Sequence, residues 1–423
     1  MDIHNLKQAN IILSRYIPAT RSLTGKDITL QRMKPLMKLL GDPHTKLKII
    51  HIAGTSGKTS TAYYVAAMLQ QSGKRVGLTV SPHVMTVTER IQINLQPLSE
   101  LEFCARLAEF LQLIKGADPQ PTYFELLVAF AYWYFAIRGV DYAVIETGLG
   151  GLHDATNIAS QPDKVCVITD IGYDHTKILG NTLTKITTQK AGIIHRHNEV
   201  FCYKQAAVVT RVLQHACTHQ QANLHQVLPP DNNELVISLP LFQRRNWHLA
   251  QEVYKFIATR DGLPPLSHAQ LNETMAVKVP ARMETITYKD KTIILDGAHN
   301  PQKLAALMAS VRYGYPVQQM AVMTGFVHSH KQKIYGNLQQ LLPLASQLII
   351  TSFIPNQEMH TASADPQVIS ALCEKLNFHN WEIASEPQAA FRELMARPEP
   401  LLLVTGSFYL MHYIRPIILE PHD

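Results

Sequence analysis

The chain has 423 residues, of which 46% are hydrophobic and 17% are charged, so a collagenous or largely disordered protein is excluded. At about 100–200 residues per domain, this length predicts two domains, or three. The mean hydropathy is −0.04 and no apolar run is long enough for a membrane helix. The polar N-terminus lacks the core of a signal peptide, so export is not expected.

Cysteine usage and charge narrow the classes further. The five cysteines are scattered and no two lie within four residues, which excludes a CxxC redox or zinc pair and predicts reduced thiols in a cytoplasmic protein. The net charge of +6 favours anionic partners. Because the basic residues are dispersed, nucleic-acid binding is not expected, and small anions such as nucleotides or carboxylates fit the charge as well.

Short β-branched runs alternate with helical stretches in the first part of the chain. This pattern is typical of a parallel sheet covered by helices on both faces. The stripe of Phe124, Leu127, Val128, Ala131 and Phe135 has helical spacing and is expected in the core. Strands are expected at 48–53, 140–145 and 164–169, and helices at 59–71 and 122–138.

A second alternating series follows after a stretch interrupted by prolines at 264, 265 and 280. The boundary is therefore placed near 284, which gives a larger domain over 1–283 and a smaller α/β domain over 284–423. Strands of this second series are expected at 292–295, 320–323, 347–351 and 401–404, with helices that begin at Pro301, Gln332 and Pro366.

The segment Gly54-Thr-Ser-Gly57-Lys58-Thr59-Ser60 lies between an expected strand and an expected helix. Glycines let the backbone approach phosphate oxygens, the first N–H groups of the helix point at the anion, and a lysine supplies charge. The usual phosphate-loop pattern needs glycine at position 52, where this chain has isoleucine, so this is a shortened variant. A plain glycine-rich turn is the alternative interpretation.

A second glycine cluster comprises Gly148, Gly150 and Gly151. It resembles a dinucleotide fingerprint, but no glycine follows three residues on and no helical pattern follows directly. We therefore reject a dinucleotide site there.

Ordered blocks from about residue 30 to residue 410 resemble the folylpolyglutamate synthase family, often bifunctional with dihydrofolate synthase, of the Mur ligase superfamily. Besides the phosphate loop, these blocks are Ser81-Pro-His, Glu89-Arg-Ile91, Thr122-Tyr-Phe-Glu125, Glu146-Thr-Gly-Leu-Gly-Gly151, Asp154-Ala-Thr-Asn157, Asp174-His175, Lys190-Ala-Gly-Ile-Ile194, Pro280-Ala-Arg282-Met-Glu284, Leu295-Asp-Gly-Ala-His-Asn-Pro301 and Thr405-Gly-Ser-Phe-Tyr-Leu410.

The resemblance implies an α/β protein with an N-terminal P-loop ATPase domain, a mainly parallel sheet and a smaller Rossmann-like C-terminal domain, with the site between them. It implies an ATP-dependent ligase that joins L-glutamate to dihydropteroate or a folate through an acyl phosphate, and releases ADP and phosphate. The expected partners are these small molecules, with no nucleic acid and no membrane, and a monomer is expected.

The resemblance also implies site residues. The implied catalytic residues are Lys58, Lys190 and His175. Mg²⁺ at two sites is implied at Ser81, Glu146, His175 and Lys190, the last as a carbamate formed with CO₂. The implied ATP contacts are Gly57, Lys58, Thr59, Ser60, Asn246, Arg282 and Asp296. The implied pterin-side contacts are Thr122, Tyr123, Phe124, Glu125, His153, Asp154 and Ala155.

Several of these residues have a second interpretation from the sequence alone. His175 and Lys190 could be ordinary surface residues, and Glu146 a solvated loop carboxylate. His299 and Asn300 could serve only to cap a helix that begins at Pro301. Leu152 and His153 stand where the family carries Arg and Leu, so the pterin side is one part of the site in which this chain departs from the family pattern. The phosphate loop also departs from it, with Ser56 and Thr59 where the family favours Asn and Gly.

Two other functions compete with folate ligation. A UDP-muramyl-peptide ligase of the same superfamily would share the phosphate loop, although the block Asp296–Pro301 favours folate. A nucleotide-switched binding protein without ligase activity would not need a two-metal site, so the joint presence of Glu146, His175 and Lys190 argues against it.

Overall fold

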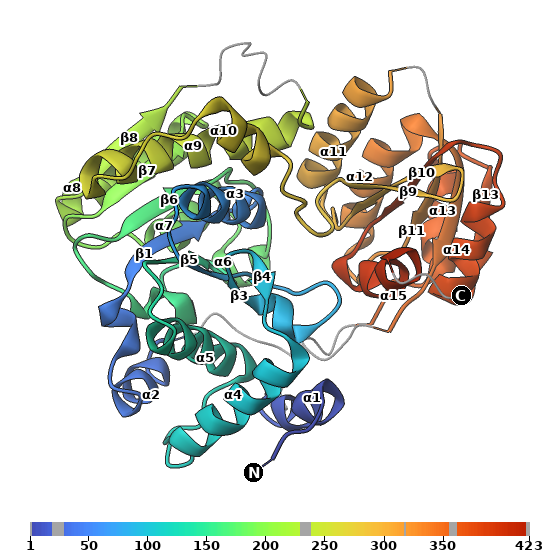
Figure 1. The fold of residues 1–423 in the computed structure, drawn as a ribbon. Helices are drawn as coiled ribbons and strands as arrows, with labels where there is room; N and C mark the ends of the chain where they lie inside the picture. Colours follow the sequence, from blue (N-terminus) through green and yellow to red (C-terminus); the bar gives the residue numbers. More distant parts are fainter. Residues whose placement is uncertain (1, 19–28, 229–237, 317–318, 355–361, 420–423) are drawn as a thin grey trace. The chain divides into compact units, whose positions relative to one another are not determined.

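The computed structural model describes residues 2–18, 29–228, 238–316, 319–354 and 362–419, which form two compact α/β units (Figure 1). The first unit is assigned to Met1–Ile237 and Gln243–Val277, and the second to Ser238–Phe242 and Lys278–Asp423. The α/β class predicted from the alternating pattern is confirmed in both units.

Within the described residues, the first unit contains one eight-stranded sheet with the order β4-β3-β2-β5-β1-β6-β7-β8. The strands from β2 to β8 in this order pair in parallel, whereas β3 and β4 are antiparallel at one edge. The strands are β1 (Lys48–Ala53), β2 (Val76–Thr79), β3 (Ile91–Ile93), β4 (Gln96–Pro97), β5 (Tyr142–Glu146), β6 (Val165–Ile168), β7 (Glu199–Tyr203) and β8 (Asn223–Val227).

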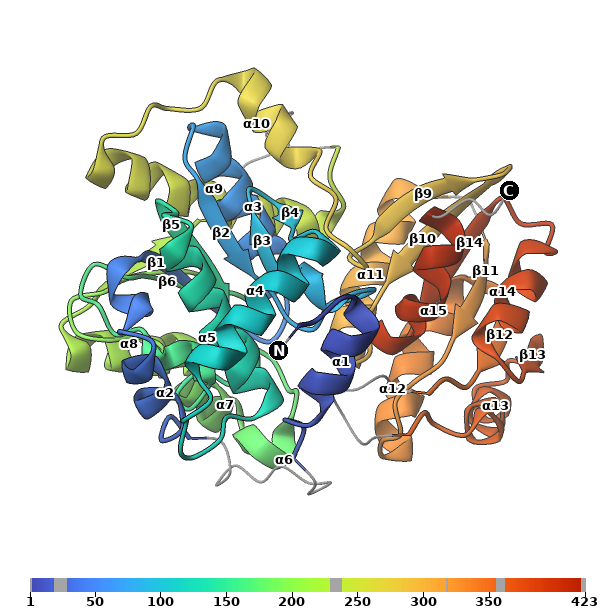
Figure 2. The same cartoon turned by 60° about the horizontal axis from the view of Figure 1, so that its bottom comes forward.

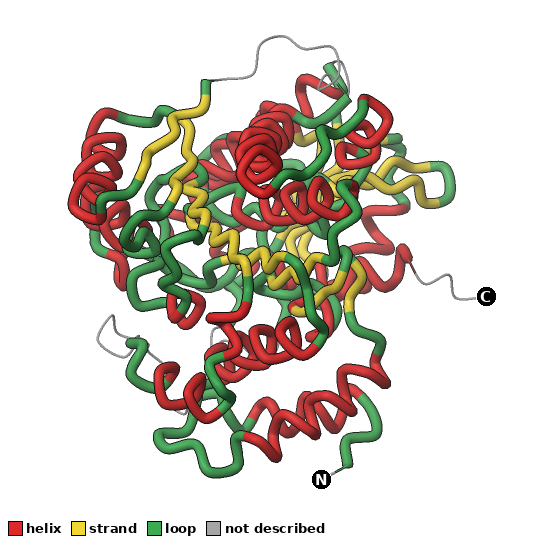
Figure 3. Tube along the Cα trace, turned by 60° about the vertical axis from the view of Figure 1, so that its left-hand side comes forward, coloured by secondary structure: helices red, strands yellow, loops and turns green. Residues whose placement is uncertain are grey.

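Helices cover both sides of this sheet, as Figure 3 shows, so its central strands are buried on both faces. That burial explains why β1, β5 and β6 are mainly apolar in the sequence. The helices are α1 (Leu6–Ser14), α2 (Met33–Leu39), α3 (Lys58–Gln71), α4 (Glu100–Leu113), α5 (Tyr123–Ile137), α6 (Thr176–Leu179), α7 (Leu183–Ala191), α8 (Ala207–Gln220), α9 (Leu241–Asp261) and α10 (His268–Met275).

Helix α5 is the centre of the largest apolar cluster, and it contacts α2 and α4 (Figure 2). It is buried around most of its circumference, because its sequence is apolar on nearly every face. The predicted stripe is buried as expected, except that Phe124 is only partly buried. The helix begins at a capping box in which the Thr122 hydroxyl accepts from the Glu125 N–H and the Glu125 carboxylate accepts from the Thr122 N–H.

The described part of the second unit contains a six-stranded sheet with the order β13-β12-β11-β14-β10-β9, parallel except for the β9–β10 pair. Its strands are β9 (Glu284–Tyr288), β10 (Lys291–Asp296), β11 (Met320–Thr324), β12 (Ala345–Thr351), β13 (Trp381–Ala384) and β14 (Leu401–Thr405). Its helices are α11 (Pro301–Gly314), α12 (Lys331–Leu341), α13 (Pro366–Lys375), α14 (Pro387–Met395) and α15 (Phe408–Leu419).

The strands expected from apolar runs are present in both units, with bounds that differ by one or two residues. Short or polar strands such as β8, whose residues are mostly polar or partly exposed, were not predicted from the sequence. No α-helix follows the Gly148–Gly151 cluster directly; a 3-10 helix at Ala155–Ile158 comes next, consistent with the rejected dinucleotide site. Across the described ranges, no helix is long and apolar enough to span a bilayer.

A buried polar cluster lies where the loop before β6 meets the end of α7. The Lys164 ammonium is fully buried and donates to the carbonyls of Ala159 and Ile193 at 2.7 and 2.8 Å. Burial lowers the pKa of Lys164 to about 8. Close by, His195 Nε2 lies 3.0 Å from Asn157 Oδ1. Burial and then the charge of Lys164 lower the pKa of His195 to about 4.

We predict that His195 makes the unfolding free energy depend on pH, and that His195→Gln removes this contribution. Below about pH 6.5 the unfolded histidine takes up a proton, whereas the folded one stays neutral down to about pH 4, so acid favours unfolding across this window. Glutamine keeps an N–H donor for Asn157 and does not titrate. Between pH 7 and pH 5 we expect the wild type to lose about 1 kcal/mol more unfolding free energy than His195→Gln, after allowance for partial exposure.

Urea unfolding at the two pH values measures this difference. The exposed residue His215 of α8 provides the control, because His215→Gln should leave the wild-type pH dependence unchanged. If the wild type and His195→Gln lost equal unfolding free energy between pH 7 and pH 5, this would contradict the conclusion that folded His195 stays neutral.

Candidate active site

Four loops follow four adjacent strands of the first sheet, at the carboxyl ends of these strands. The strand order β2-β5-β1-β6 places the carboxyl ends of these strands next to one another. In open parallel sheets ligands bind at the carboxyl ends of the strands. The loops carry Ser81 after β2, Glu146 and its glycines at the end of β5, the glycine-rich segment after β1, and His175 after β6.

The glycine-rich segment connects β1 to α3, which begins at Lys58 directly after it, as the phosphate-loop pattern predicts. Gly57 has φ +88°, and a Cβ there would lie 2.5 Å from Asn246 Oδ1. A Cβ on Gly54 would lie 1.8 Å from the Thr169 hydroxyl oxygen. Close packing therefore favours glycine at both positions.

Two serine hydroxyls of this segment lack a hydrogen-bond partner among the described residues, which suggests that they bind a ligand. The side-chain oxygens of Ser56 and Ser60 are buried, and neither has a hydrogen-bond partner in the part of the chain that the structure describes. Buried polar atoms are nearly always hydrogen-bonded in native proteins. A bound anion that accepts from these hydroxyls would satisfy them, and Lys58 lies between them in the sequence.

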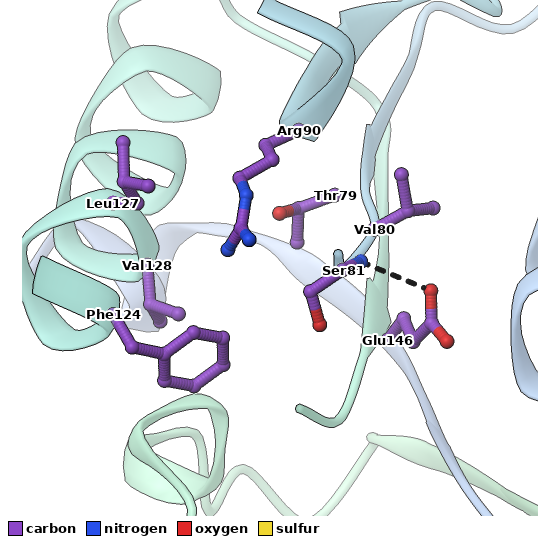
Figure 4. A pocket seen from close by; sticks show the side chains of 8 residues that line it. All are labelled: Thr79, Val80, Ser81, Arg90, Phe124, Leu127, Val128 and Glu146. Atoms are coloured by element: carbon purple, nitrogen blue, oxygen red, sulfur yellow. Dashed lines mark hydrogen bonds between the residues drawn. The ribbon is translucent and has the colours of Figure 1, made fainter. Parts of the chain in front are cut away.

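Glu146 joins three of the four loops. Its side chain is buried, with 3% of the residue exposed. The Thr59 hydroxyl donates to Glu146 Oε1 at 2.8 Å, and the Ser81 N–H donates to Oε2 at 3.2 Å (Figure 4). The alternative of a solvated loop carboxylate does not fit this burial.

Lys190 and the segment before His175 also lie against the glycine-rich loop. Lys190 is 5% exposed, and its Nζ donates to the Gly54 carbonyl at 2.7 Å, so it is not a surface lysine. The N–H groups of Thr55 and Ser56 donate to the Asp170 carbonyl at 2.8 and 3.2 Å. His175 itself is exposed and has φ +49°. Lys190 and the segment that precedes His175 thus both contact the glycine-rich loop.

The oxygen atoms around Glu146 suit a hard cation. Among the described residues, no group of three or more His, Cys, Asp or Glu side chains could hold a metal ion. The site offers a small set of protein oxygens, namely the Glu146 carboxylate and the Thr59 and Ser81 hydroxyls. Such a set is enough for Mg²⁺, because Mg²⁺ typically keeps several waters and binds few carboxylates. The donor set therefore fits Mg²⁺ better than it fits zinc or another metal that prefers nitrogen and sulfur.

A pocket opens beside Glu146 and is walled by α5 on one side (Figure 4). Arg90 was not among the predicted site residues, although it lies in the Glu89-Arg-Ile91 block. Arg90 is 3% exposed, its Nε donates to His83 Nδ1 at 3.1 Å, and its side chain extends between α5 and Ser81. The pocket is lined by Thr79, Val80, Ser81, Arg90, Phe124, Leu127, Val128 and Glu146.

The segment Thr122–Glu125 divides its work between this pocket and the helix start. Phe124 lines the pocket and lies directly over Gly148, where a Cβ would be 2.3 Å from the ring. Thr122 and Glu125 form the cap of α5, and Glu125 also accepts from Arg32 Nε at 2.8 Å. Tyr123 is buried, and its hydroxyl has no partner among the described residues.

The second predicted pterin-side segment is mostly buried. His153 is exposed, whereas Ala155 is buried. The Asp154 carboxylate is buried and accepts from the Leu149 N–H at 2.7 Å and from the Thr156 N–H at 3.0 Å. Burial raises the pKa of Asp154, and these donors act in the opposite direction. Asp154 therefore holds the loop in place, and its carboxylate already has several donors.

Helix α9 lies over the glycine-rich loop, with Asn246 against Gly57. The neighbouring Arg245 pairs with the Asp170 carboxylate at 2.9 Å and stacks on the Tyr203 ring at 4.1 Å from its centroid. Asp170 is the residue whose carbonyl accepts from the glycine-rich loop. The same contacts thus place Asn246 beside the loop, as its predicted role requires.

In the second unit, Asp296 ends β10 and is buried, with the N–H groups of Met283 and Ala298 donating to its carboxylate at 2.7 and 2.8 Å. Burial raises the pKa of Asp296 to about 6 against the effect of the Arg282 charge. The Arg282 guanidinium lies 4.0 Å from the Phe408 ring centroid. Asn300 caps α11, as the structural interpretation expects.

His299 does not cap this helix. Its Nδ1 lies 2.8 Å from the Gly297 carbonyl, and its Nε2 lies 3.1 Å from Lys303 Nζ.

Two family descriptions match the chain. Residues 52–228 match the Mur ligase middle domain, and residues 281–408 match the Mur ligase glutamate ligase domain. The folylpolyglutamate synthase of Lacticaseibacillus casei is 32% identical over 422 residues, which cover 92% of this chain and 94% of that protein. The dihydrofolate synthase/folylpolyglutamate synthase of Bacillus subtilis is 29% identical over 418 residues, covering 91% and 94%.

The fold is also similar to that of a solved enzyme. The crystal structure of Mycobacterium tuberculosis folylpolyglutamate synthase, complexed with ADP and AMPPCP, superposes with a TM-score of 0.83 and 25% identity over 99% of both chains. Sequence, domain descriptions and fold agree with the resemblance read from the motifs. The chain belongs to the folylpolyglutamate synthase family of the Mur ligases.

Proposed function

We propose that this protein is an ATP-dependent ligase that forms an amide bond between L-glutamate and a carboxylate of dihydropteroate or a reduced folate. The family membership supports this reaction, and the relatives carry these activities in their names. The observation that carries the proposal is the Thr59–Glu146 hydrogen bond beside the unpartnered hydroxyls of Ser56 and Ser60. It joins a triphosphate cradle to a cation-binding carboxylate.

The reaction needs an activated carboxylate, because a free carboxylate is a poor acyl donor. The γ-phosphoryl group of ATP moves to an oxygen of the acceptor carboxylate, giving an acyl phosphate and ADP. The glutamate amine then attacks the acyl carbon, the C–N bond forms, phosphate leaves with the C–O bond electrons, and the amine loses a proton. Such transfers need positioning and charge neutralisation more than covalent help from the protein.

We assign the phosphate contacts to Gly57, Lys58, Thr59 and Ser60, and a nucleotide contact to Asn246, because these residues surround the loop between β1 and α3. Lys58 supplies a positive charge for the β- and γ-phosphates. Arg282 and Asp296 remain predicted ATP contacts in the second unit. The functional division into 1–283 and 284–423 likewise stays a proposal.

We assign Mg²⁺ to Ser81, Glu146 and His175, with Thr59 hydrogen-bonded to Glu146, and a second ion to a carbamylated Lys190. When bound, Mg²⁺ offsets the repulsion between the triphosphate and the acceptor carboxylate. The second assignment is supported by the position of Lys190 Nζ beside the Gly54 carbonyl and by its burial, which favours the neutral amine that reacts with CO₂.

The acceptor side is assigned to the pocket beside Glu146. Phe124, which lines the pocket, offers a ring for stacking. Tyr123 remains a predicted acceptor contact, and its buried hydroxyl has no partner among the described residues. Thr122, Glu125 and the segment His153–Ala155 remain predicted acceptor contacts. Thr122 and Glu125 also form the cap of α5. Exposed Leu152 stands where the family carries Arg, which removes a cation from this surface.

We also propose that the protein acts as a monomer in the cytoplasm on small-molecule substrates. All five cysteines are free and buried in the structure, which suits a reducing compartment. Sedimentation at working concentrations tests the oligomeric state.

A comparison of acceptors tests the function directly. ADP release is measured with ATP, Mg²⁺ and L-glutamate, with either dihydropteroate or tetrahydrofolate, and in parallel with a UDP-muramyl substrate and its amino acid. We expect turnover with at least one pteridine acceptor and none with the muramyl substrate. Turnover only with the muramyl substrate would replace the proposal, and nucleotide binding without any turnover would favour a switch protein.

Lys58→Ala tests the phosphate loop. Removal of the ammonium group should lower ADP release by about 100-fold or more, because one preorganised charge on a transferring phosphoryl group contributes on this scale. The unfolding temperature should stay near that of the wild type. The matched control is Lys115→Ala, which removes an exposed lysine of the same unit. Activity near the wild-type level in Lys58→Ala would refute the role of the loop.

Mass analysis tests the carbamate. Native mass spectrometry of protein incubated with bicarbonate should show the added mass of one CO₂, assigned by fragmentation to the peptide with Lys190. The control protein Lys190→Arg should show no such addition. An unmodified Lys190 in protein with two bound Mg²⁺ ions would contradict the proposal.

A further inference from the structure

The proposed mechanism gives no role to His51, a fully buried histidine in the middle of β1. This strand leads into the phosphate loop three residues later, and His51 lies between Ile145 of β5 and Cys166 of β6 in the strand register. A histidine in a central strand is unusual, because burial of a polar ring is unfavourable unless the ring is hydrogen-bonded. The partners of this ring therefore indicate why it is there.

His51 Nε2 contacts two hydroxyl groups from different segments. It lies 2.9 Å from Thr156 Oγ1 and 3.0 Å from Thr147 Oγ1. Thr147 directly follows Glu146, and its N–H donates to the Ile52 carbonyl at 2.9 Å. Thr156 belongs to the loop after β5, so a single ring nitrogen links β1 to both ends of this loop.

The hydrogen-bond network assigns the proton of the ring. The Thr156 hydroxyl donates its one proton to Asp154 Oδ1 at 2.5 Å, so its oxygen accepts from His51 Nε2–H. Nδ1 is then a bare acceptor, and it has no partner within the described ranges. Burial, followed by the charges of Lys164 and His195, lowers the pKa of His51 well below its usual value, which agrees with a neutral ring.

This chain of bonds continues to the acceptor pocket. The Asp154 carboxylate, held by Thr156, accepts from the Leu149 N–H at 2.7 Å. Leu149 follows Gly148, and Gly148 lies against the ring of Phe124, which lines the pocket beside Glu146. The position of the loop from Gly148 to Asp154 therefore determines the wall on which Phe124 packs.

We propose that His51 is a positioning residue, which through Thr147, Thr156 and Asp154 holds the acceptor-side loop in register with the strand that carries the phosphate loop. The inference rests on the proposed function for the identity of the acceptor. Its structural part, the fixing of the loop by Nε2–H, holds independently of which acceptor binds. Thr156 is a positioning residue of the same kind.

Two substitutions of nearly equal chemistry separate positioning from packing. In His51→Gln the side-chain amide reaches the place of Nε2 and can donate to Thr156, whereas in His51→Asn the shorter amide lies near the place of Nδ1. Thr156→Ser keeps the hydroxyl link, and Thr156→Val removes it at nearly constant volume. Ile50→Val trims a buried residue of the same strand outside this network and serves as the stability control.

Steady-state kinetics with the pteridine acceptor that the wild type uses is the first measurement. His51→Asn and Thr156→Val should raise the acceptor KM by about tenfold or more, since each leaves a buried polar group unpaired. The KM for ATP should stay within about twofold, as expected for a change confined to the acceptor side. His51→Gln and Thr156→Ser should stay within about threefold of the wild-type acceptor KM. Ile50→Val should lower only the unfolding temperature.

Hydrogen exchange of the peptide spanning 147–156 is the second measurement and needs no activity. His51→Asn should accelerate exchange of the Leu149 and Thr156 amides, and His51→Gln should not. Loss of this contrast, or equal KM values in the Asn and Gln variants, would overturn the inference. If the two variants show the exchange contrast but the wild type turns over no pteridine acceptor, only the proposed function is overturned.

Discussion

The hydrogen bond from the Thr59 hydroxyl to the Glu146 carboxylate is the contact on which the proposed site depends. It joins the first turn of α3 to the end of β5, and the parallel register that pairs Ile52 with Glu146 brings these two segments to the same height. A carboxylate that is 3% exposed requires compensating charge or hydrogen bonds. Ser81 and Thr59 supply hydrogen bonds from two sides, and a bound cation would supply the charge.

Much of the fold could be predicted because its central strands are buried on both faces. The runs of β1, β5 and β6 are mainly apolar and short, and turn residues follow them, which is typical of strands buried on both faces. The turn between β1 and α3 could be predicted because its residues are consecutive. The polar edge strand β8 could not, because its pattern matches that of a surface loop.

The remaining contacts of the candidate site could not be predicted from the sequence, for a different reason. His51 contacts residues 96 and 105 positions away, and Arg90 joins a pocket wall made by α5. Such pairings depend on strand order and on loop paths, which spacing alone does not encode. Glu125 has contacts that its motif position did not indicate, because it forms the cap of α5 and an ion pair with Arg32.

The burial of the cysteines has a consequence for measuring how this protein opens. Four thiols, at positions 104, 166, 202 and 217, lie inside the first unit, and Cys373 alone lies inside the second. Burial also raises the pKa of Cys373 to about 12, which keeps it unreactive as a thiol in the folded state. Alkylating reagents should therefore label each unit only when it unfolds, and the labelled peptide identifies which unit has opened.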